Sequence, residues 1–440
     1  MNELNQGRLR ILFDASMLAE GLHKTSQRSG IFWTTYEIFR ELDARDDVEL
    51  GVYAPPSRVD CVNAFLVEAF PGRGYRVLNR ARSCFLGPVE NWILGKKELP
   101  CNKAGLRRRV LQVAGLFAKV ARILWDKHVG SRKVAKIADG FDAFFSPVYL
   151  APWAVRKYSK VPRFAILYDT IPAIFPQFSP VTRLGFSWNF DLIRGLREDD
   201  RGFAISECTK RDFLRFAPRL RAENVDIVPL AAGANFHPVK DEGEFRRVRD
   251  KYGIPEGRRY VLSLCTIAPH KNLGRALEAF GRLVEKDGVR DIVFVLAGGK
   301  WGFFEGKWAA TLEKLGKTRD LVIPAGYIDD EDLAALYSGA EMFVYPSLYE
   351  GFGLPPLEAM QCGTPVITSN VSSIPEVVGD AAITVDPESV DALAEAMERL
   401  ARDAELRAAL RTRGLARAAE FSWAKTADLI VRSIRGENLL

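Results

Sequence analysis

The sequence predicts an α/β protein of two consecutive doubly wound domains that face each other across a cleft. Apolar strand segments alternate with helical segments through most of the chain, and the alternation begins afresh near its middle. The chain has 440 residues, which is too long for one ordinary core. Two domains of roughly 200 residues each would place the carboxyl ends of both sheets along one cleft.

The first domain is predicted to span residues 1–235. Its strands are the apolar segments 9–13, 48–53, 143–146, 164–168, 203–205 and 227–230. A loop rich in Gly, Ser and Lys follows the first strand, and residues 31–42 then have helical spacing. Because Pro, Gly and Asn cluster over 229–238, we place the domain boundary there.

The second domain, residues 236–421, repeats the pattern more cleanly. Its strands are predicted at 260–264, 292–297, 322–324, 342–345, 366–368 and 382–385. Helices fit between them, for example at 273–283 and 331–337. The last segment, 422–440, contains a helix with an apolar stripe over 423–434, and we expect it to pack back onto the first domain.

One segment interrupts the first domain. Residues 96–136 contain twelve Lys or Arg and two acids, with apolar residues on one helical face. This pattern favours a helix that lies on an anionic membrane, but a core-packed helix with a solvated basic face fits it equally well. No RNA- or DNA-binding motif accompanies the basic residues, so we expect no nucleic-acid partner.

The composition indicates the general class of protein. Hydrophobic and charged contents of 48% and 27% are ordinary for a soluble globular protein, and the polar start of the chain shows no signal peptide. The six cysteines form no CxxC pair, which is typical of a reducing cytoplasm. None of the four histidines is spaced to share a metal, so we expect neither a metal site nor a cofactor.

The segment 345–386 carries the chemistry. An apolar strand leads into a loop with two glycines, and two prolines then open a helix. Free N–H groups and the positive end of the helix dipole make such a point suitable for an anion. Glu350 and Glu358 bracket it, which favours a phosphorylated ligand with hydroxyl groups on both sides of the phosphate.

This segment resembles a known family. The run EGFGLPPLE, residues 350–358, is similar to the paired-glutamate motif of family 4 retaining glycosyltransferases, which have two Rossmann-like domains in the GT-B arrangement. SNVSSIPEVVGDAAITVDP, SLCTIAPHKN and FSW resemble the bacterial mannosyltransferase branch that builds O-antigen and capsule polysaccharides. FFSPVYLAP, YDTIPAIFP, FAISECTKRDF and VPLAAGANFHP follow in family order in the first domain.

The resemblance implies roles for particular residues. The catalytic positions are Glu350, Lys271, Asp169 and Tyr168. The donor-binding positions are Thr266, His270, Lys271, Tyr349, Glu350, Gly351, Phe352, Gly353, Leu354 and Glu358, and Gly30 belongs to the loop that faces acceptor and phosphate.

Lys271 would stabilise the departing diphosphate, Glu358 would accept the ribose hydroxyls, and Glu350 would hold the transferred sugar. Structural alternatives stay open: Lys271 as a surface lysine, Glu358 as a complement to the helix dipole, and Gly30 as a helix start. A helix-cap role for His270 is as probable as a role in donor binding.

Two positions depart from the family pattern. Thr266 stands where many relatives have an arginine that binds phosphate, and Tyr168, before Asp169, stands where many have a histidine. Tyrosine is a poor base near neutral pH.

The function expected from the resemblance is retaining, metal-independent transfer of a hexose. The first guess is mannose from GDP-mannose, moved to a growing, lipid-linked surface polysaccharide at the inner face of the membrane by a cytoplasmic, peripheral enzyme. The alternatives are a UDP- or dTDP-sugar donor, a phosphorylase or epimerase in the same kind of cleft, and a sugar-nucleotide-binding subunit that has lost catalysis.

Overall fold

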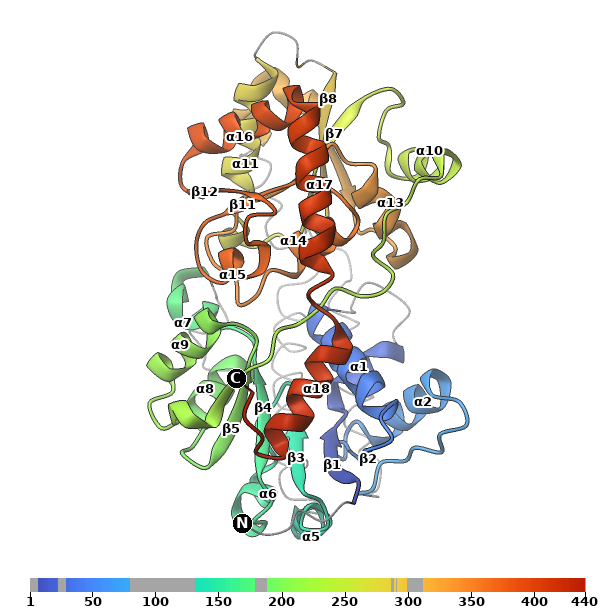
Figure 1. The fold of residues 1–440 in the computed structure, drawn as a ribbon, viewed down its shortest axis with the longest axis vertical. Coiled ribbons are helices and arrows are strands. Elements are labelled where there is room, and N and C mark those ends of the chain that lie inside the picture. Colours follow the sequence, from blue (N-terminus) through green and yellow to red (C-terminus); the bar gives the residue numbers. More distant parts are fainter. Residues whose placement is uncertain are drawn as a thin grey trace, which may run out of the picture.

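The computed structural model describes residues 7–22, 29–79, 131–178, 188–285, 289, 291–298 and 312–439. Within them the chain forms two six-stranded sheets, in the orders β2-β1-β3-β4-β5-β6 and β12-β11-β10-β7-β8-β9. Every strand pair is parallel. The two units lie one above the other in Figure 1, with helices packed around each sheet. These features confirm the predicted α/β class with two doubly wound sheets.

The first sheet is built from short apolar strands. Phe13, Phe144, Phe145 and Phe203 are fully buried between the sheet and its helices. The strands are β1 (Leu9–Asp14), β2 (Val48–Tyr53), β3 (Ala143–Ser146), β4 (Arg163–Leu167), β5 (Asp200–Ala204) and β6 (Val225–Ile227). The α-helices around them are α1 (Gly30–Asp43), α2 (Val59–Ala69), α5 (Ser131–Ala138), α6 (Trp153–Tyr158), α7 (Ile171–Ile174), α8 (Trp188–Gly195) and α9 (Glu207–Phe216).

The second sheet has the same architecture. Its strands are β7 (Arg259–Leu264), β8 (Ile292–Ala297), β9 (Val322–Gly326), β10 (Met342–Tyr345), β11 (Val366–Ser369) and β12 (Ile383–Val385). Its α-helices are α10 (Glu242–Tyr252), α11 (Leu273–Val284), α13 (Leu333–Ser338), α14 (Leu354–Gln361), α15 (Ile374–Val378), α16 (Val390–Arg402) and α17 (Ala404–Ala418). Helix α14 packs against α17, and α11 packs against α16.

The chain crosses between the two units twice. After α17 it returns to the lower unit of Figure 1 and forms α18 (Trp423–Ile434), which packs against α1. The hydroxyl of Thr426 donates to the carbonyl of Pro229 at 2.7 Å. Asp428 forms an ion pair with Arg45 at 3.2 Å. The last helix is therefore fastened to the first domain by polar contacts as well as by packing.

Most of the basic segment 96–136 lies outside the described residues, so its predicted amphipathic helix is not seen; only its last residues, from Ser131 on, are described, in α5. In the part of the chain that the structure describes, no helix is both long enough and apolar enough to span a bilayer.

Candidate active site

A cleft of about 550 Å³ lies between the two units, lined by residues that follow the carboxyl ends of strands from both sheets. It is narrow where α1 faces α14, since a Cβ at Gly30 would lie 3.8 Å from Cδ1 of Leu354. Most of the predicted site residues line it, namely Gly30, Tyr168, Asp169, Thr266, Lys271, Glu350, Gly351, Phe352, Gly353, Leu354 and Glu358. His270 and Tyr349 do not line it.

The centre of the cleft holds a cluster of three side chains. Nζ of Lys271 lies 2.7 Å from Oε1 of Glu350 and 2.7 Å from the hydroxyl oxygen of Tyr345. The Tyr345 hydroxyl donates to the same carboxylate oxygen at 2.8 Å. The side chains of Lys271 and Glu350 are only 13% and 11% exposed, so each charge depends on the other for compensation.

The sheet topology explains why these residues meet. Strand β10 pairs with β7, and Tyr345 is the last residue of β10. Lys271 ends the turn that follows β7. Asn272 holds this turn in the left-handed region, with φ of 58°, and its side-chain amide donates to the carbonyls of Pro346 and Pro387 at 3.0 and 2.6 Å. Lys271 is thereby fixed on the cleft side and pairs with Glu350.

The ionisation of Glu350 follows from this pairing. Burial alone would raise the pKa of the carboxyl, but the charge of Lys271, the field of His270 and hydrogen bonds from Lys271 and Ser347 outweigh it and lower the pKa below its ordinary value. Burial and Lys271 lower the pKa of His270 to about 4, against the opposing effect of Glu350, so the imidazole is neutral near pH 7. The pair therefore consists of one ammonium and one carboxylate.

The loop from Glu350 to α14 is rigidly held. The hydroxyl of Ser373 donates to the carbonyls of Glu350 and Phe352 at 2.9 and 2.8 Å, and the hydroxyl of Ser372 accepts from the N–H of Glu350 at 3.0 Å. Gly353 caps α14 with φ of 120°, a conformation that favours glycine. The N–H groups of Phe352, Gly353 and Leu354 donate to no other described residue, so they remain available to an anion at the helix N-terminus.

Glu358 lies one turn further along α14. Its carboxylate accepts from the hydroxyl of Tyr337 at 3.0 Å and lines the cleft. Burial raises the pKa of Glu358 to about 7, although the Tyr337 hydrogen bond acts in the opposite direction. This carboxyl is therefore desolvated and has only one described protein donor for its two oxygens, which suits a ligand with hydroxyl groups.

The opposite wall contributes Tyr168 and Asp169, directly after β4. Asp169 Oδ1 accepts from the N–H of Ile171 at 2.9 Å and from the amide of Asn189 at 3.3 Å. Burial raises the pKa of Asp169, and the nearby Glu350 raises it further. Tyr168 is 6% exposed, and burial raises its pKa far above neutrality, so this side chain cannot serve as a base near pH 7.

Helix α9 ties the two walls together beside Glu350. The hydroxyls of Ser206 and Thr209 donate to the carbonyl of Gly351 at 2.7 and 2.9 Å. Thr209 also donates to the carbonyl of Tyr168 at 3.2 Å. The hydroxyl of Tyr349 donates to Asp212 on the same helix, which turns this side chain away from the cleft.

Several cleft residues were not predicted from the sequence. The sequence pattern predicted Tyr345 only as a strand residue, and it predicted Trp423 only as part of the apolar stripe of the last helix. The Nε1 atom of Trp423 is buried without a partner among the described residues. Thr34 and Glu37 are 1% and 6% exposed and line the cleft together with Gly30. Their spacing along α1 places all three on one helical face, and this signal could have identified them.

In the described ranges, no group of three or more His, Cys, Asp or Glu side chains is placed to hold a metal ion. Among the described residues that line the cleft, Lys271 is the one Lys or Arg.

Comparison with known proteins identifies the family. Residues 244–417 match the family described as Glycosyl transferases group 1. A D-inositol 3-phosphate glycosyltransferase of Corynebacterium diphtheriae is 30% identical over 416 residues, which cover 91% of this chain and 88% of that protein. The chain belongs to the glycosyl transferase group 1 family.

Two Escherichia coli relatives are more similar over shorter lengths. The O-antigen chain mannosyltransferase B is 36% identical over 219 residues, which are 50% of this chain and 56% of that protein. The serotype-specific mannosyltransferase WbdA is 34% identical over 233 residues, which are 53% of this chain and 28% of that protein. The alignments thus span about half of O-antigen chain mannosyltransferase B and about a quarter of WbdA.

Solved structures of other glycosyltransferases share the fold of this group 1 family member. WaaG, named as a glycosyltransferase involved in lipopolysaccharide biosynthesis, aligns with a TM-score of 0.62 at 16% identity over 97% of this chain and 100% of its own. Anabaena HepE in complex with UDP-glucose aligns with a TM-score of 0.64 at 16% identity, over 98% of this chain and 100% of its own. The two-domain fold is GT-B, as the resemblance implied.

Proposed function

We propose that the protein transfers a hexose from a nucleotide diphosphate sugar to a growing glycan. One observation carries this proposal: the buried Lys271–Glu350 pair lies beside the free N–H groups at the start of α14 and faces Asp169 across the cleft. A cation and preorganised N–H donors suit a departing diphosphate, because negative charge builds up on the leaving oxygen as the sugar bond breaks.

The roles divide along the cleft. The diphosphate lies over the N–H groups of Phe352, Gly353 and Leu354 and accepts from the ammonium of Lys271. Glu358 accepts the ribose hydroxyls. Glu350 holds the transferred sugar and stabilises the positive charge that develops at its anomeric carbon. Transfer proceeds on the front face with retention, and the leaving phosphate takes the proton of the acceptor hydroxyl, since Tyr168 is too weak a base.

We propose mannose from GDP-mannose as the donor and a lipid-linked surface polysaccharide at the inner face of the membrane as the acceptor. The support is similarity to the two Escherichia coli mannosyltransferases, over about half of this chain. Thermal-shift and hydrolysis measurements with GDP-, UDP- and dTDP-sugars test the donor. Stabilisation and turnover with GDP-mannose are expected, whereas a response restricted to a UDP- or dTDP-sugar would reject this assignment.

The proposal includes catalysis without a metal or cofactor, with Lys271 supplying the positive charge. Donor turnover in the presence of EDTA is expected to match that without it. Loss of turnover with EDTA, restored by a divalent cation, would contradict this part of the proposal.

A second candidate is a sugar-nucleotide-binding subunit without catalysis. It is favoured by the replacement of a basic side chain at two positions, Thr266 and Tyr168. Donor binding with no turnover on any acceptor, and none with water, would support this candidate over the transferase.

A further inference from the structure

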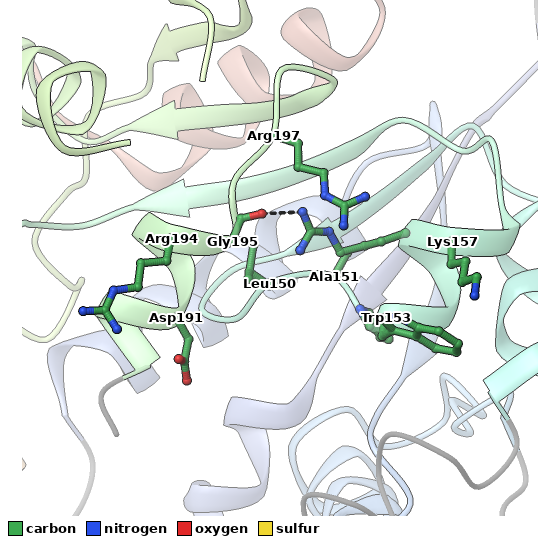
Figure 2. Close-up of a pocket in the computed structure, with 10 residues that line it drawn as sticks. Leu150, Ala151, Trp153, Lys157, Asp191, Arg194, Gly195 and Arg197 are labelled. Carbon is green, nitrogen blue, oxygen red and sulfur yellow. Dashed lines mark hydrogen bonds between the residues drawn. The ribbon is translucent and has the colours of Figure 1, made fainter. Parts of the chain in front are cut away.

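A second pocket lies in the first domain, outside the cleft. We call it the α6–α8 pocket; it has a volume of about 860 Å³ and is lined by Leu150, Ala151, Pro152, Trp153, Arg156, Lys157, Asp191, Arg194, Gly195 and Arg197. None of these residues lines the cleft. In Figure 2 the side chains of Lys157, Arg194 and Arg197 surround the pocket from different sides. Four cations and one acid therefore share one concave surface.

Three acids next to this pocket already have partners. Asp200 pairs with Arg156 at 3.1 Å and with Arg163 at 2.6 Å. Asp199 pairs with Arg163, and Glu198 pairs with Arg221. Within the described ranges Lys157, Arg194 and Arg197 form no ion pair, and Asp191 is the one acid among the described lining residues, so positive charge exceeds negative charge on this surface. An anionic ligand would balance that excess.

Arg156 is fixed by the fold beside these three cations. Its side chain is 11% exposed and donates to the carbonyl of Gly195, at the end of α8. Its Nε atom is buried without a partner among the described residues. Burial lowers the pKa of Arg156, attraction to Asp200 opposes this, and repulsion from Arg197 and Arg163 lowers the pKa again. Arg156 and Arg197 are thus close enough to repel each other, and both line the pocket.

Two exposed aromatic residues border the same surface. Trp153 and Tyr158, at the two ends of α6, are 39% and 42% exposed, and their ring centroids lie 5.4 Å apart. The ammonium of Lys157 lies 4.8 Å from the centre of the Trp153 ring, and Arg132 of α5 lies 5.7 Å from that of Tyr158. Trp and Tyr beside cations are typical of the headgroup region of a bilayer, where the rings lie between water and hydrocarbon.

We propose that the α6–α8 pocket binds the phosphate group of an anionic lipid at a membrane surface. Guanidinium groups bind phosphate oxygens through paired hydrogen bonds, and the bordering rings match a bilayer better than a soluble anion. This inference rests on the proposed function in one respect, the lipid-linked acceptor. Binding to an anionic lipid would bring the enzyme to the membrane surface that carries such an acceptor. It uses none of the cleft residues.

The test is co-sedimentation of the full chain with vesicles of phosphatidylcholine, with and without phosphatidylglycerol. The variant R194A/R197A removes two exposed pocket cations, and R215A/R219A removes two exposed cations of the same domain outside the pocket. We expect binding only to the phosphatidylglycerol vesicles. The pocket variant is expected to bind roughly 30-fold more weakly, because each basic residue near an anionic surface contributes about 1 kcal/mol. The control variant should retain most of the binding.

Other outcomes would overturn the inference. Equal losses of vesicle binding in both variants would mean that the overall positive charge, and not the pocket, binds the membrane. Unchanged vesicle binding of the pocket variant would exclude the pocket as the binding site. Binding of inorganic phosphate at the pocket without binding to phosphatidylglycerol vesicles would reject the lipid. Donor hydrolysis in solution is measured in parallel and should be the same in R194A/R197A as in the unmodified protein, so a failure of the proposed transferase activity remains distinguishable.

Discussion

At the scale of single residues, the buried pair of Lys271 and Glu350 combines stability with chemistry. We expect Glu350→Gln to lower the rate of transfer by at least about 100-fold, because the sugar cation loses its counter-charge. The same change leaves the ammonium of Lys271 without its partner, which costs about 3–5 kcal/mol when a buried pair is broken. Transfer rate and thermal unfolding measured on the same sample report the two effects.

Tyr345→Phe is the matched control, because it removes the hydroxyl and keeps the ion pair. Its rate of transfer should fall far less than that of Glu350→Gln. Full activity of the Glu350→Gln variant would remove the catalytic role assigned to this residue.

Glu358 should make stability depend on pH. Its pKa rises from 4.5 to about 7 on folding, so the folded protein binds more protons than the unfolded chain between these values. The contribution of Glu358 to the free energy of unfolding is therefore fully present below pH 4.5 and is lost as the pH rises through about 7. Glu358→Gln, which stays neutral, should therefore stabilise the ligand-free protein by about 1–3 kcal/mol at pH 8 and have little effect at pH 4.5.

The measurement is urea unfolding of both proteins across this pH range. The variant should also bind the donor more weakly at pH 8, because a neutral amide replaces the carboxylate at the ribose. A difference in stability that does not change with pH would contradict the burial argument for Glu358.

Only some of the residues in the cleft could be predicted from the sequence. The resemblance to the family implied roles for Lys271, Glu350 and Glu358, and the structure brings all three to one cleft. Tyr345 was missed because an apolar strand pattern does not reveal that its last hydroxyl reaches a carboxylate. Tyr349 contacts Asp212 instead of the cleft, through a pairing between residues far apart in the sequence.

At the scale of elements, the contact between α9, the Glu350 loop and the end of β4 sets the width of the cleft. A Cβ at Gly351 would lie 1.9 Å from the carbonyl oxygen of Tyr168 and 3.0 Å from Cβ of Asp169. Gly351→Ala must therefore push the loop or the whole upper unit away from the lower one. We expect the rate of transfer to fall by about 100-fold, since a displacement near 1 Å has this effect on reacting groups.

Small-angle scattering and steady-state kinetics measure the two consequences. Gly281→Ala in α11 is the control outside the cleft, because its Cβ would meet only the side chain of Thr318, at 3.8 Å, an ordinary contact. Equal activities of the two variants would argue against this role for the Gly351 contact.

Several strands were predicted with their observed bounds. Strands β2, β3, β8 and β10 have the predicted bounds. Strand β5 instead begins at Asp200, ahead of the predicted start at 203, because Arg163 and Arg156 pair with this buried acid. Gly202 belongs to the strand because Leu167 packs over it, with Cδ1 only 2.6 Å from a Cβ built there. Such partners on other elements cannot be read from a short window of sequence.

At the scale of the whole molecule, helix α18 follows the second domain in the chain but packs against the first domain. Its face contains Ala427, Ile430 and Val431, all at most 1% exposed, and it packs against α1 of the first domain. The apolar stripe over 423–434 predicted this helix, since a surface helix must bury its apolar face somewhere. The stability of the first domain therefore depends on residues that follow the second domain in the chain.

Ile430→Ala tests this dependence. Removing a fully buried isoleucine side chain costs about 2–5 kcal/mol, and the loss should be confined to the part of the molecule against which α18 packs. Hydrogen exchange should accelerate in α1, β1 and β3 and remain unchanged in β7, β8 and β10. Leu400→Ala, equally buried in α16, should produce the opposite pattern, because α16 packs against α11 and β11 of the second sheet. If Ile430→Ala accelerated exchange equally in both sheets, the two units would unfold as one, and α18 would be a part of a common core instead of a strap across the first domain.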